Sequence, residues 1–236
     1  MISSQWLTLY MDILPALRAS ISQCMQSLPE LRNTVTRKAD LSPVTQADYL
    51  LDHRIAKTIE QYYPDVIIVS EERHLPKGSL EMGWVAVVDP LDGTENFVAD
   101  LPLWGVSISL WHDGQHSASL LSFPELGLSL ASGDQIVKAH SAISGFSSSS
   151  PATVISEHSA STGEFRVLGS AAFNLFCVAT GRLQSFHNTV GANAWDILAG
   201  INLAIEQGCE VLIDDESYRG QFLVPTRKYR VEVFNK

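Results

Sequence analysis

Residues 84–94 (WVAVVDPLDGT) constrain the fold of this 236-residue chain more than any other segment. An unbroken run of β-branched and apolar residues predicts a short buried strand. Because proline has a fixed φ and no N–H donor, we expect the strand to stop at Pro90. Thr94 is then expected to cap a helix that begins at this turn. The segment therefore predicts a buried strand with Asp89 and Asp92 at its mouth.

Acidic residues also mark the ends of two other apolar segments. Glu71 and Glu72 follow the run VIIVS (66–70), and Asp196 lies at the start of an apolar helical segment. Carboxylates beside a phosphate suit Mg²⁺, which prefers carboxylate and phosphate oxygens as ligands. A helix that begins at Gly93 would also present free N–H groups to an anion. We therefore expect these acids to converge on a metal and phosphate site.

Each acidic segment also has a purely structural interpretation. An isolated DPLDG sequence (89–93) is typical of an ordinary solvated turn. An aspartate in the first turn of a helix, such as Asp196, interacts favourably with the helix dipole. Three separate segments that end in acids fit a metal site better than they fit unrelated structural roles.

The charge and composition of the chain limit its partners. The net charge of −10 argues against a nucleic acid polymer as a partner, because phosphate backbones are bound by clusters of Lys and Arg. An anionic substrate would therefore need positive charge from bound metal ions. The chain has three cysteines without a CxxC pair, no signal peptide and no apolar run of about 20 residues. We therefore expect a cytoplasmic protein that does not associate with membranes.

The remainder of the chain predicts helices, then a strand meander, then alternating helix and strand. Helices are expected at 2–28 (interrupted by Pro15), 46–63, 169–181 and 194–208, and strands at 66–70, 84–90, 105–111, 116–123, 126–132 and 210–214. The Ser-rich segment 144–152 is interpreted as an exposed loop or domain boundary, and the residues between the last two helices as a loop. This order predicts a layered α/β fold with mixed sheets.

Five segments of the sequence carry a resemblance to a known family. They are KADLSPVTQAD (38–48), SEE (70–72), VDPLDGTENF (88–97), GSAAFNLFCVATGR (169–182) and AWDILAG (194–200). With these segments, in this order, the chain resembles the inositol monophosphatase family of Mg²⁺-dependent, lithium-sensitive phosphomonoesterases. The resemblance implies an αβαβα sandwich of the sugar-phosphatase type. It further implies an N-terminal α+β half (1–140) with the DPLDGT site, a C-terminal α/β half (141–236) that supplies Asp196 and the substrate wall, and a homodimer.

The resemblance assigns roles to individual residues. The ligands of two or three Mg²⁺ ions would be Glu71, Asp89, Asp92, Asp196 and the carbonyl group of Leu91. Thr94 and Glu71 would orient the attacking water, and Asp48 would be associated with a further ion and with this water. The substrate contacts would come from Gly93, Thr94, Gly169, Ser170, Ala171 and Asp196. Lys38 is similar to a loop lysine near the phosphate, and Thr45 and Glu72 would support the site.

The substrate implied by the resemblance is a small phosphorylated metabolite, and different segments favour different compounds. Residues 92–97 and 101–110 are most similar to the inositol branch, which favours inositol monophosphate. Residues 38–48 are more similar to the branches of 3′-phosphoadenosine 5′-phosphate nucleotidase and histidinol-phosphatase. A non-catalytic regulatory or binding member of the same fold is the remaining alternative.

Two departures from the family pattern bear on the substrate. Inositol enzymes carry a glutamate a few residues before the Trp-Asp motif, and this chain has no acid between Gln184 and Asp196. The stretch 133–168 is also short, and we expect it to lack a helix and a strand that typical members have there.

Overall fold

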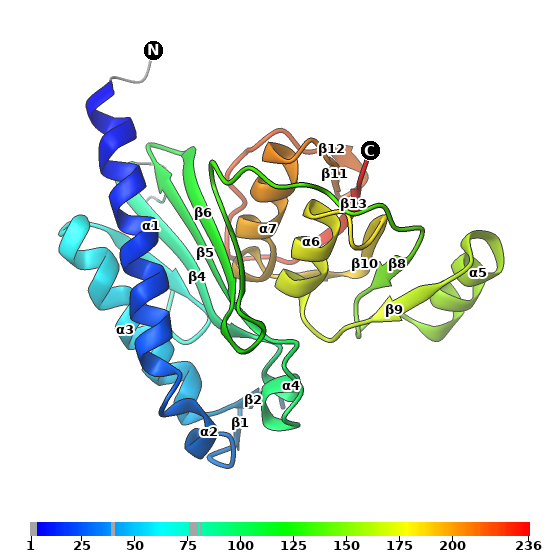
Figure 1. Ribbon diagram of the computed structural model, residues 1–236, viewed down its shortest axis with the longest axis horizontal. Coiled ribbons are helices and arrows are strands. Elements are labelled where there is room, and N and C mark those ends of the chain that lie inside the picture. Colours follow the sequence, from blue (N-terminus) through cyan, green and yellow to red (C-terminus); the bar gives the residue numbers. More distant parts are fainter. Residues whose placement is uncertain (1–3, 39–40, 76–79, 81) are drawn as a thin grey trace.

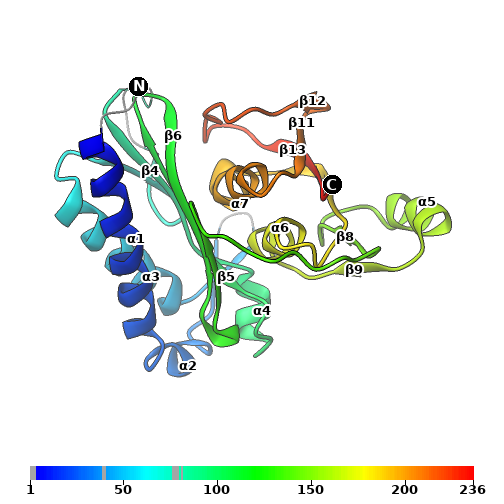
Figure 2. The ribbon, with the colours of Figure 1, turned by 45° about the horizontal axis from the view of Figure 1, so that its top comes forward.

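The computed structural model describes residues 4–38, 41–75, 80 and 82–236. Residues 39 and 40 of the 38–48 segment, and the first residues of the helix expected at 2–28, lie outside the described residues. Helices and strands form successive layers, as Figures 1 and 2 show. The observed architecture confirms the predicted α/β sandwich.

The first layers are two helices packed on one face of a five-stranded sheet. The helices are α1 (Ser4–Cys24) and α3 (Gln46–Tyr62), and the sheet has the order β3 (Ile67–Ser70), β4 (Trp84–Asp92), β5 (Gly105–His112), β6 (Gln115–Phe123) and β7 (Leu128–Ala131). The strands from β4 to β7 are antiparallel neighbours, which confirms the predicted meander, and β3 joins β4 in parallel. The other elements of this part of the chain are short: α2 (Leu28–Leu31), β1 (Thr36–Arg37), β2 (Pro43–Val44), α4 (Thr94–Val98) and a 3₁₀ turn at Pro124–Leu126.

The next layers are the helices α6 (Ala171–Ala179) and α7 (Ala194–Glu206) and a second sheet. This six-stranded sheet has the order β12 (Glu216–Ser217), β11 (Glu210–Ile213), β13 (Tyr229–Phe234), β10 (Ser185–Ala192), β8 (Ser144–Phe146) and β9 (Phe165–Val167). The helix α5 (Ala152–Thr162) lies beyond the β8 and β9 edge, far from α1 and α3 (Figure 1). The division at residue 140 into an N-terminal and a C-terminal half stays a prediction.

The strand β4 is apolar without interruption because both of its faces are covered. Val85 and Val87 belong to a hydrophobic core that also contains residues of α6 and α7, whereas Ala86 and Val88 belong to a core with α1 and α3. Since successive side chains of a strand point to opposite faces, each face needs its own apolar set. The run of valines thus reflects the position of β4 between two helical layers.

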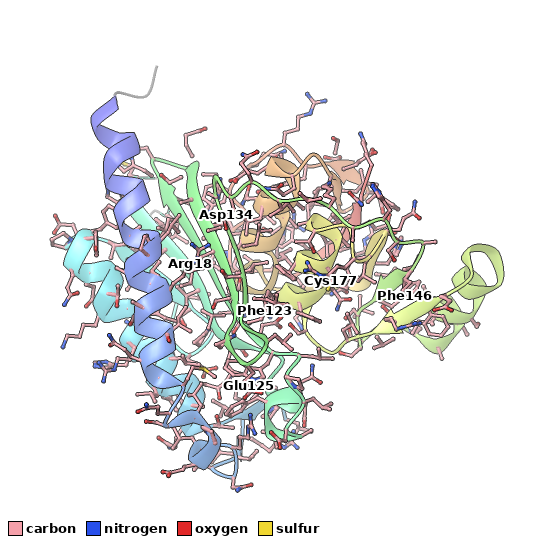
Figure 3. The ribbon with its side chains drawn as sticks, viewed as in Figure 1. Arg18, Phe123, Glu125, Asp134, Phe146 and Cys177 are labelled. Carbon is pink, nitrogen blue, oxygen red and sulfur yellow. The ribbon has the colours of Figure 1, made fainter. Side chains whose placement is uncertain are left out.

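Aromatic packing and an ion pair fasten the first sheet to its helices, as Figure 3 shows for Arg18, Phe123 and Asp134. The ring of Phe123 lies 5.0 Å from the rings of Phe173 and Phe176, which α6 contributes. On the other side, Arg18 of α1 forms a 2.8 Å ion pair with Asp134, just after β7. Among the described residues, no helix is both long and apolar enough to cross a membrane.

Two expectations for residues 84–94 are wrong. The strand β4 does not stop at Pro90 but continues to Asp92, with a register shift against β5 between Asp89 and Asp92. Such a bulge accommodates a proline, because the ladder there does not require its missing N–H group. The N-cap of α4 is Gly93 rather than Thr94, and its φ of 91° is a conformation that favours glycine.

The second half of the chain departs further from expectation. The segment 144–152 is not simply an exposed loop, because it begins with the buried strand β8. The stretch 133–168 does not lack a helix and a strand, since α5 and β9 lie within it. Residues 185–192, expected as a loop, form the strand β10, and β13 was not predicted at all. Burial on both faces of β10 overrides the polar appearance of its sequence, SFHNTVGA.

Candidate metal and phosphate site

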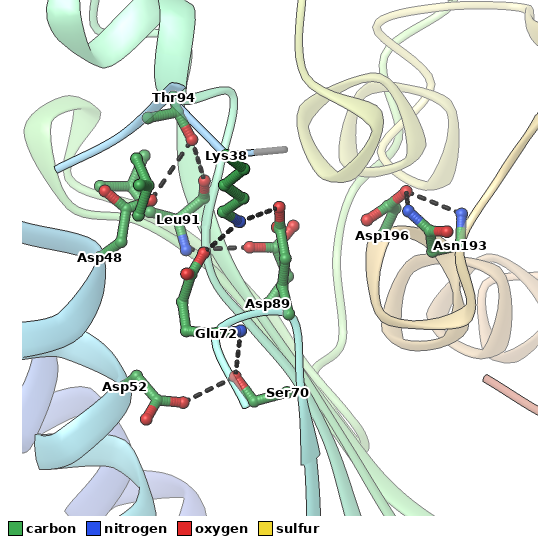
Figure 4. A network of polar contacts seen from close by, with 12 residues as sticks. Lys38, Asp48, Asp52, Ser70, Glu72, Asp89, Leu91, Thr94, Asn193 and Asp196 are labelled. Carbon is green, nitrogen blue, oxygen red and sulfur yellow. Dashed lines mark hydrogen bonds and ion pairs between the residues drawn. The ribbon is translucent and has the colours of Figure 1, made fainter. Parts of the chain in front are cut away.

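Acidic side chains from three elements meet where β3 and β4 end. Ligand oxygens of Glu71, Asp89 and Asp196 all lie within 4.8 Å of one another. Glu71 directly follows β3. Asp89 lies within β4 and Asp196 in the first turn of α7, and Figure 4 labels both. Asp89 is only 1% exposed, so bulk water does not solvate its charge. The fold therefore brings together acids that are up to 125 positions apart in the sequence (Glu71 to Asp196).

The electrostatics of this cluster call for a cation. Burial raises the pKa of Asp89 well above its ordinary value, and the negative charges of Glu71, Asp92 and Asp196 raise it further. The pKa of Asp196 is raised in the same way, by burial and then by the charges of Asp92 and Glu71. A divalent ion would relieve this repulsion, and a set of carboxylate oxygens is the donor type that Mg²⁺ and Ca²⁺ prefer. The residues present thus fit a hard divalent cation.

Asp92 lies at the edge of the cluster and connects the first sheet to α6. Its carboxylate accepts hydrogen bonds from the Ser170 hydroxyl and from the Ala172 backbone N–H group, the latter at 2.6 Å. Burial raises the pKa of Asp92 to about 6, although these hydrogen bonds lower it in part. Asp92 is not one of the three acids whose oxygens lie mutually within 4.8 Å, but it lines the adjoining cavity.

The Thr94 hydroxyl lies between two acceptors. Its Oγ1 atom is 3.3 Å from Asp48 Oδ1 and 3.2 Å from the carbonyl oxygen of Leu91 (Figure 4). The other oxygen of Asp48 accepts hydrogen bonds from the Thr45 N–H group at 2.8 Å and the Thr45 hydroxyl at 2.7 Å. These bonds form a capping box at the start of α3. Asp48 therefore stabilises α3 and positions Thr94 at the same time.

Lys38 brings a positive charge to the metal side of the site. Its Nζ atom lies 2.7 Å from Glu71 and 2.7 Å from Glu72. Burial raises the pKa of Glu72 to about 7 despite this ammonium group. A metal ion bound at the cluster would share Glu71 with Lys38.

Sequence reasoning missed the group that supports the turn carrying Glu71 and Glu72. Asp52 accepts hydrogen bonds from the Ser70 hydroxyl at 2.6 Å and from Arg73 Nε at 2.8 Å. The Ser70 hydroxyl in turn accepts from the Glu72 N–H group at 3.3 Å. Asp52 lies four residues after Asp48 in α3, and this i, i+4 spacing was the available signal.

A cavity of about 160 Å³ opens beside the acids. The predicted substrate residues Gly169, Ser170 and Ala171 line it together with Asp92 and Asp196. Gly169 has a φ of 76°, and a Cβ atom there would lie 2.8 Å from the Asn96 side chain. Glycine is therefore needed for this turn to approach α4 so closely.

Other walls of the cavity were not predicted. Ser147, Ser148 and Ser149 line it at the end of β8, and Asn174 and Asn188 line it from α6 and β10. The serine segment had been interpreted as a loop or boundary, and β10 as a loop, so neither was expected near substrate. Gly93 and Thr94 do not line the cavity, although a Cβ atom on Gly93 would lie 3.1 Å from Ser170 Cβ.

Comparison with known proteins agrees with this fold. The model of the inositol monophosphatase family matches residues 13–146 and 134–233. A fructose-1,6-bisphosphatase/inositol-1-monophosphatase of Thermotoga maritima is 30% identical over 181 residues, covering 70% of this chain and 69% of the relative. A protein of Pasteurella multocida named Nus factor SuhB is 30% identical over 196 residues, covering 73% of this chain and 72% of that protein.

A solved structure matches nearly the whole molecule. Staphylococcal inositol monophosphatase-1, in an inhibitory complex soaked in lithium chloride, has a TM-score of 0.81 and 18% identity. The match covers 99% of this chain and 92% of the staphylococcal chain, which shows a shared fold. The fold and the family define a phosphoric monoester hydrolase. More particularly, the chain belongs to the inositol monophosphatase family.

Proposed function

We propose that this protein is a Mg²⁺-dependent phosphomonoesterase that hydrolyses a small phosphorylated metabolite, with inositol monophosphate as its preferred substrate. The observation that carries the proposal is the meeting of Glu71, Asp89 and Asp196 within 4.8 Å, beside a cavity bordered by Asp92. Burial raises the pKa values of Asp89, Asp92 and Asp196, so their charged forms are costly unless a cation neutralises them. They are explained by ions that neutralise a phosphate group.

The metal site is assigned to Glu71, Asp89, Asp92, Asp196 and the Leu91 carbonyl group, for two or three Mg²⁺ ions. Bound ions at such a site supply charge neutralisation of the phosphate and a lowered pKa of water. Thr94, held by Asp48 and Leu91, is suited to orient the attacking water by its hydroxyl oxygen while its proton is directed to Asp48. Glu71 is the second group assigned to this water.

The substrate is positioned by the turn Gly169–Ser170–Ala171 and by the start of α4. Gly93 is the N-cap of α4 and Thr94 is its first residue, so the free N–H groups of the first turn begin here, and such groups favour a phosphate oxygen. Ser170 donates to Asp92 and so fixes the distance between the substrate turn and the acids. This arrangement holds the ester between the two sheets.

Further properties of the family belong to the same proposal. We expect inhibition by lithium, a homodimer, and activity in the cytoplasm, without a nucleic acid polymer or a membrane as partner. The lithium-soaked complex of the staphylococcal neighbour supports the first of these expectations.

The test is a phosphate-release assay on purified protein with Mg²⁺. The substrates would be inositol 1-phosphate, adenosine 3′,5′-bisphosphate, histidinol phosphate and fructose 1,6-bisphosphate. We expect release that is abolished by EDTA, reduced by lithium and highest with inositol 1-phosphate. Robust release in EDTA would contradict the metal assignment. Silence with every ester would favour a binding role for this member of the fold.

A further inference from the structure

The cavity has two chemically different parts. Asp92 and Asp196 form the acidic part, and the remaining walls are neutral. Within the part of the chain that the structure describes, no Lys, Arg, His or Glu side chain lines the cavity. Any group of a ligand that lies against the neutral walls would have to exchange its water for amide and hydroxyl groups alone.

Asn188 of β10 presents an oriented amide to the neutral part. It is 4% exposed, and its Oδ1 atom accepts hydrogen bonds from the N–H groups of Val190 at 3.2 Å and Gly191 at 2.9 Å. Two N–H donors identify this atom as the oxygen, so the Nδ2 group is directed elsewhere. Nδ2 has no hydrogen-bond partner among the described residues, and the side chain lines the cavity. The cavity therefore has a fixed, unused donor.

Asn174 and Ser148 add further polar groups to the lining of the cavity. Asn174 is 1% exposed and lines the cavity, its Nδ2 group donates to the Ser170 carbonyl group at 2.7 Å, and its Oδ1 atom has no partner among the described residues. Ser148 contributes a hydroxyl from a turn that is held at both ends. The Ser147 N–H group donates to the His187 carbonyl group at 3.0 Å, and the Ser150 N–H group donates to the Ser147 carbonyl group at 3.0 Å.

An amide donor without a partner and a buried acceptor without a partner are each costly unless a ligand or water satisfies them. A hydroxyl group does so, because it donates and accepts at once. An ammonium or imidazolium group would lack a neutralising carboxylate at these walls, and a second phosphate would lack a cation.

We propose, on the basis of the phosphatase function proposed above, that Asn188 is a specificity-determining residue of this cavity. Its Nδ2 group donates to a hydroxyl oxygen of the alcohol half of the ester, and Asn174 and Ser148 complete a neutral wall around that half. The wall selects esters whose alcohol is uncharged and carries hydroxyl groups. It rejects esters whose alcohol carries an amine or a second phosphate.

The variant Asn188→Asp tests this proposal directly. An aspartate keeps the oxygen that accepts from Val190 and Gly191, but it replaces the donor by a negative charge. We expect kcat/KM for inositol 1-phosphate to fall roughly 10- to 100-fold, as is typical when a buried polar contact is lost. With histidinol phosphate the loss should be smaller or reversed, so the ratio of the two values should change at least about tenfold. p-Nitrophenyl phosphate, which has no hydroxyl group for Asn188, serves as the internal reference.

A second variant and a matched control complete the experiment. Ser148→Asp places a charge at another, exposed residue of the cavity lining, so it leaves the fold intact, and it should shift the ratio in the same direction. Asn235→Asp makes the same chemical change where the side chain accepts from Lys138, at 2.6 Å, and should leave the ratio unchanged. All assays use saturating Mg²⁺, and thermal unfolding checks that each variant is folded.

The outcomes separate this inference from the proposed function. Suppose that the wild-type protein hydrolyses esters but both variants change kcat/KM for all substrates by the same factor. The assignment of Asn188 is then overturned and the phosphatase function stands. If the wild-type protein releases phosphate from no ester, the proposed function fails and the specificity role falls with it. A change in the ratio for Asn188→Asp and Ser148→Asp, without one for Asn235→Asp, supports the inference.

Discussion

The two sheets of this protein supply different chemistry to one site. The five-stranded sheet contributes the charged side, with Glu71 after β3 and Asp89 and Asp92 in β4. The six-stranded sheet contributes neutral amide and hydroxyl groups, with Asn188 in β10 and the serine turn after β8. The helix α7, between the sheets, adds a further acid, Asp196. Under the proposed function, binding of the phosphate would be separated from recognition of the alcohol, so we expect substitutions on the two sides to have different effects.

The largest expected effect comes from removing a charge on the acidic side. Asp89→Asn should lower kcat by roughly 10³-fold or more in Mg²⁺, because the site loses one of its three closest acids. In EDTA the same variant should unfold at a higher temperature, by roughly 2–8 °C, because a buried and unpaired charge is gone.

Activity assays and thermal unfolding would check both halves of this expectation. Asp113→Asn, at an exposed turn where the side chain accepts from Gly83 N–H, is the matched control and should change neither. An Asp89→Asn protein with normal activity would show that the acidic side is not the metal site.

The acidic side should also dominate the pH dependence of the metal-free protein. The pKa of Asp92 is raised from 3.8 to about 6, so its protonated form is favoured in the folded state. This contribution to stability is complete below about pH 4 and is lost as the pH rises through 6. The loss is about 3 kcal/mol for a shift of about two units.

Urea unfolding in EDTA between pH 4 and pH 8 would measure this change. We expect the unfolding free energy to fall over this range in EDTA, and the fall to be reduced by saturating Mg²⁺. A metal-free protein whose stability rises with pH between 4 and 6 would contradict the assigned electrostatics.

A smaller effect is expected where the two sides meet. The Ser170 hydroxyl caps α6 by accepting from Phe173 N–H at 3.0 Å and donates to Asp92. Ser170→Ala should cost about 1 kcal/mol of stability from the lost cap, and it should raise KM roughly tenfold with a smaller effect on kcat.

Unfolding and steady-state kinetics would separate these two consequences. Ser170→Thr retains the hydroxyl and should rescue both. A loss of stability without any change in KM would mean that Ser170 is only a helix cap.

The smallest effect is expected from Lys38, whose ammonium group lies 2.7 Å from Glu71 and from Glu72. Lys38→Met removes a cation that competes with the metal for Glu71, so Mg²⁺ should bind a few-fold more tightly. Calorimetry with Mg²⁺ alone would measure this change. Weaker binding of Mg²⁺ would show instead that Lys38 holds Glu71 in the orientation that the metal requires.

The success of sequence reasoning also differs between the two sheets. The bounds of the strands β3 to β6 were predicted to within a few residues. These strands are largely buried, so their sequences are apolar runs separated by turn residues. β10 and β13 were missed, since β10 reads as polar and its cavity-facing residues Phe186 and Asn188 alternate with His187. His187 instead pairs with Glu232 of β13 at 2.9 Å, a contact between segments 45 positions apart.

The sequence by itself determined the acids and the turns that carry them. Carboxylates at the ends of apolar segments can be recognised in a sequence without a structure. Four acids are recognised in this way: Glu71, Asp89, Asp92 and Asp196. The family resemblance added their likeness to a metal site, and the structure placed three of them within 4.8 Å.

Only the tertiary structure decided the neutral side of the cavity. Serine and asparagine are common in turns, so Ser148, Asn174 and Asn188 carry no signal of their own in the chain. The donor of Asn188 and the acceptor of Asn174 become meaningful only when the fold places these two buried amides around one cavity, where water no longer satisfies polar groups without cost. The sequence states the chemical type of each side chain. Whether a polar side chain has a hydrogen-bond partner depends on residues that only the folded structure brings near it.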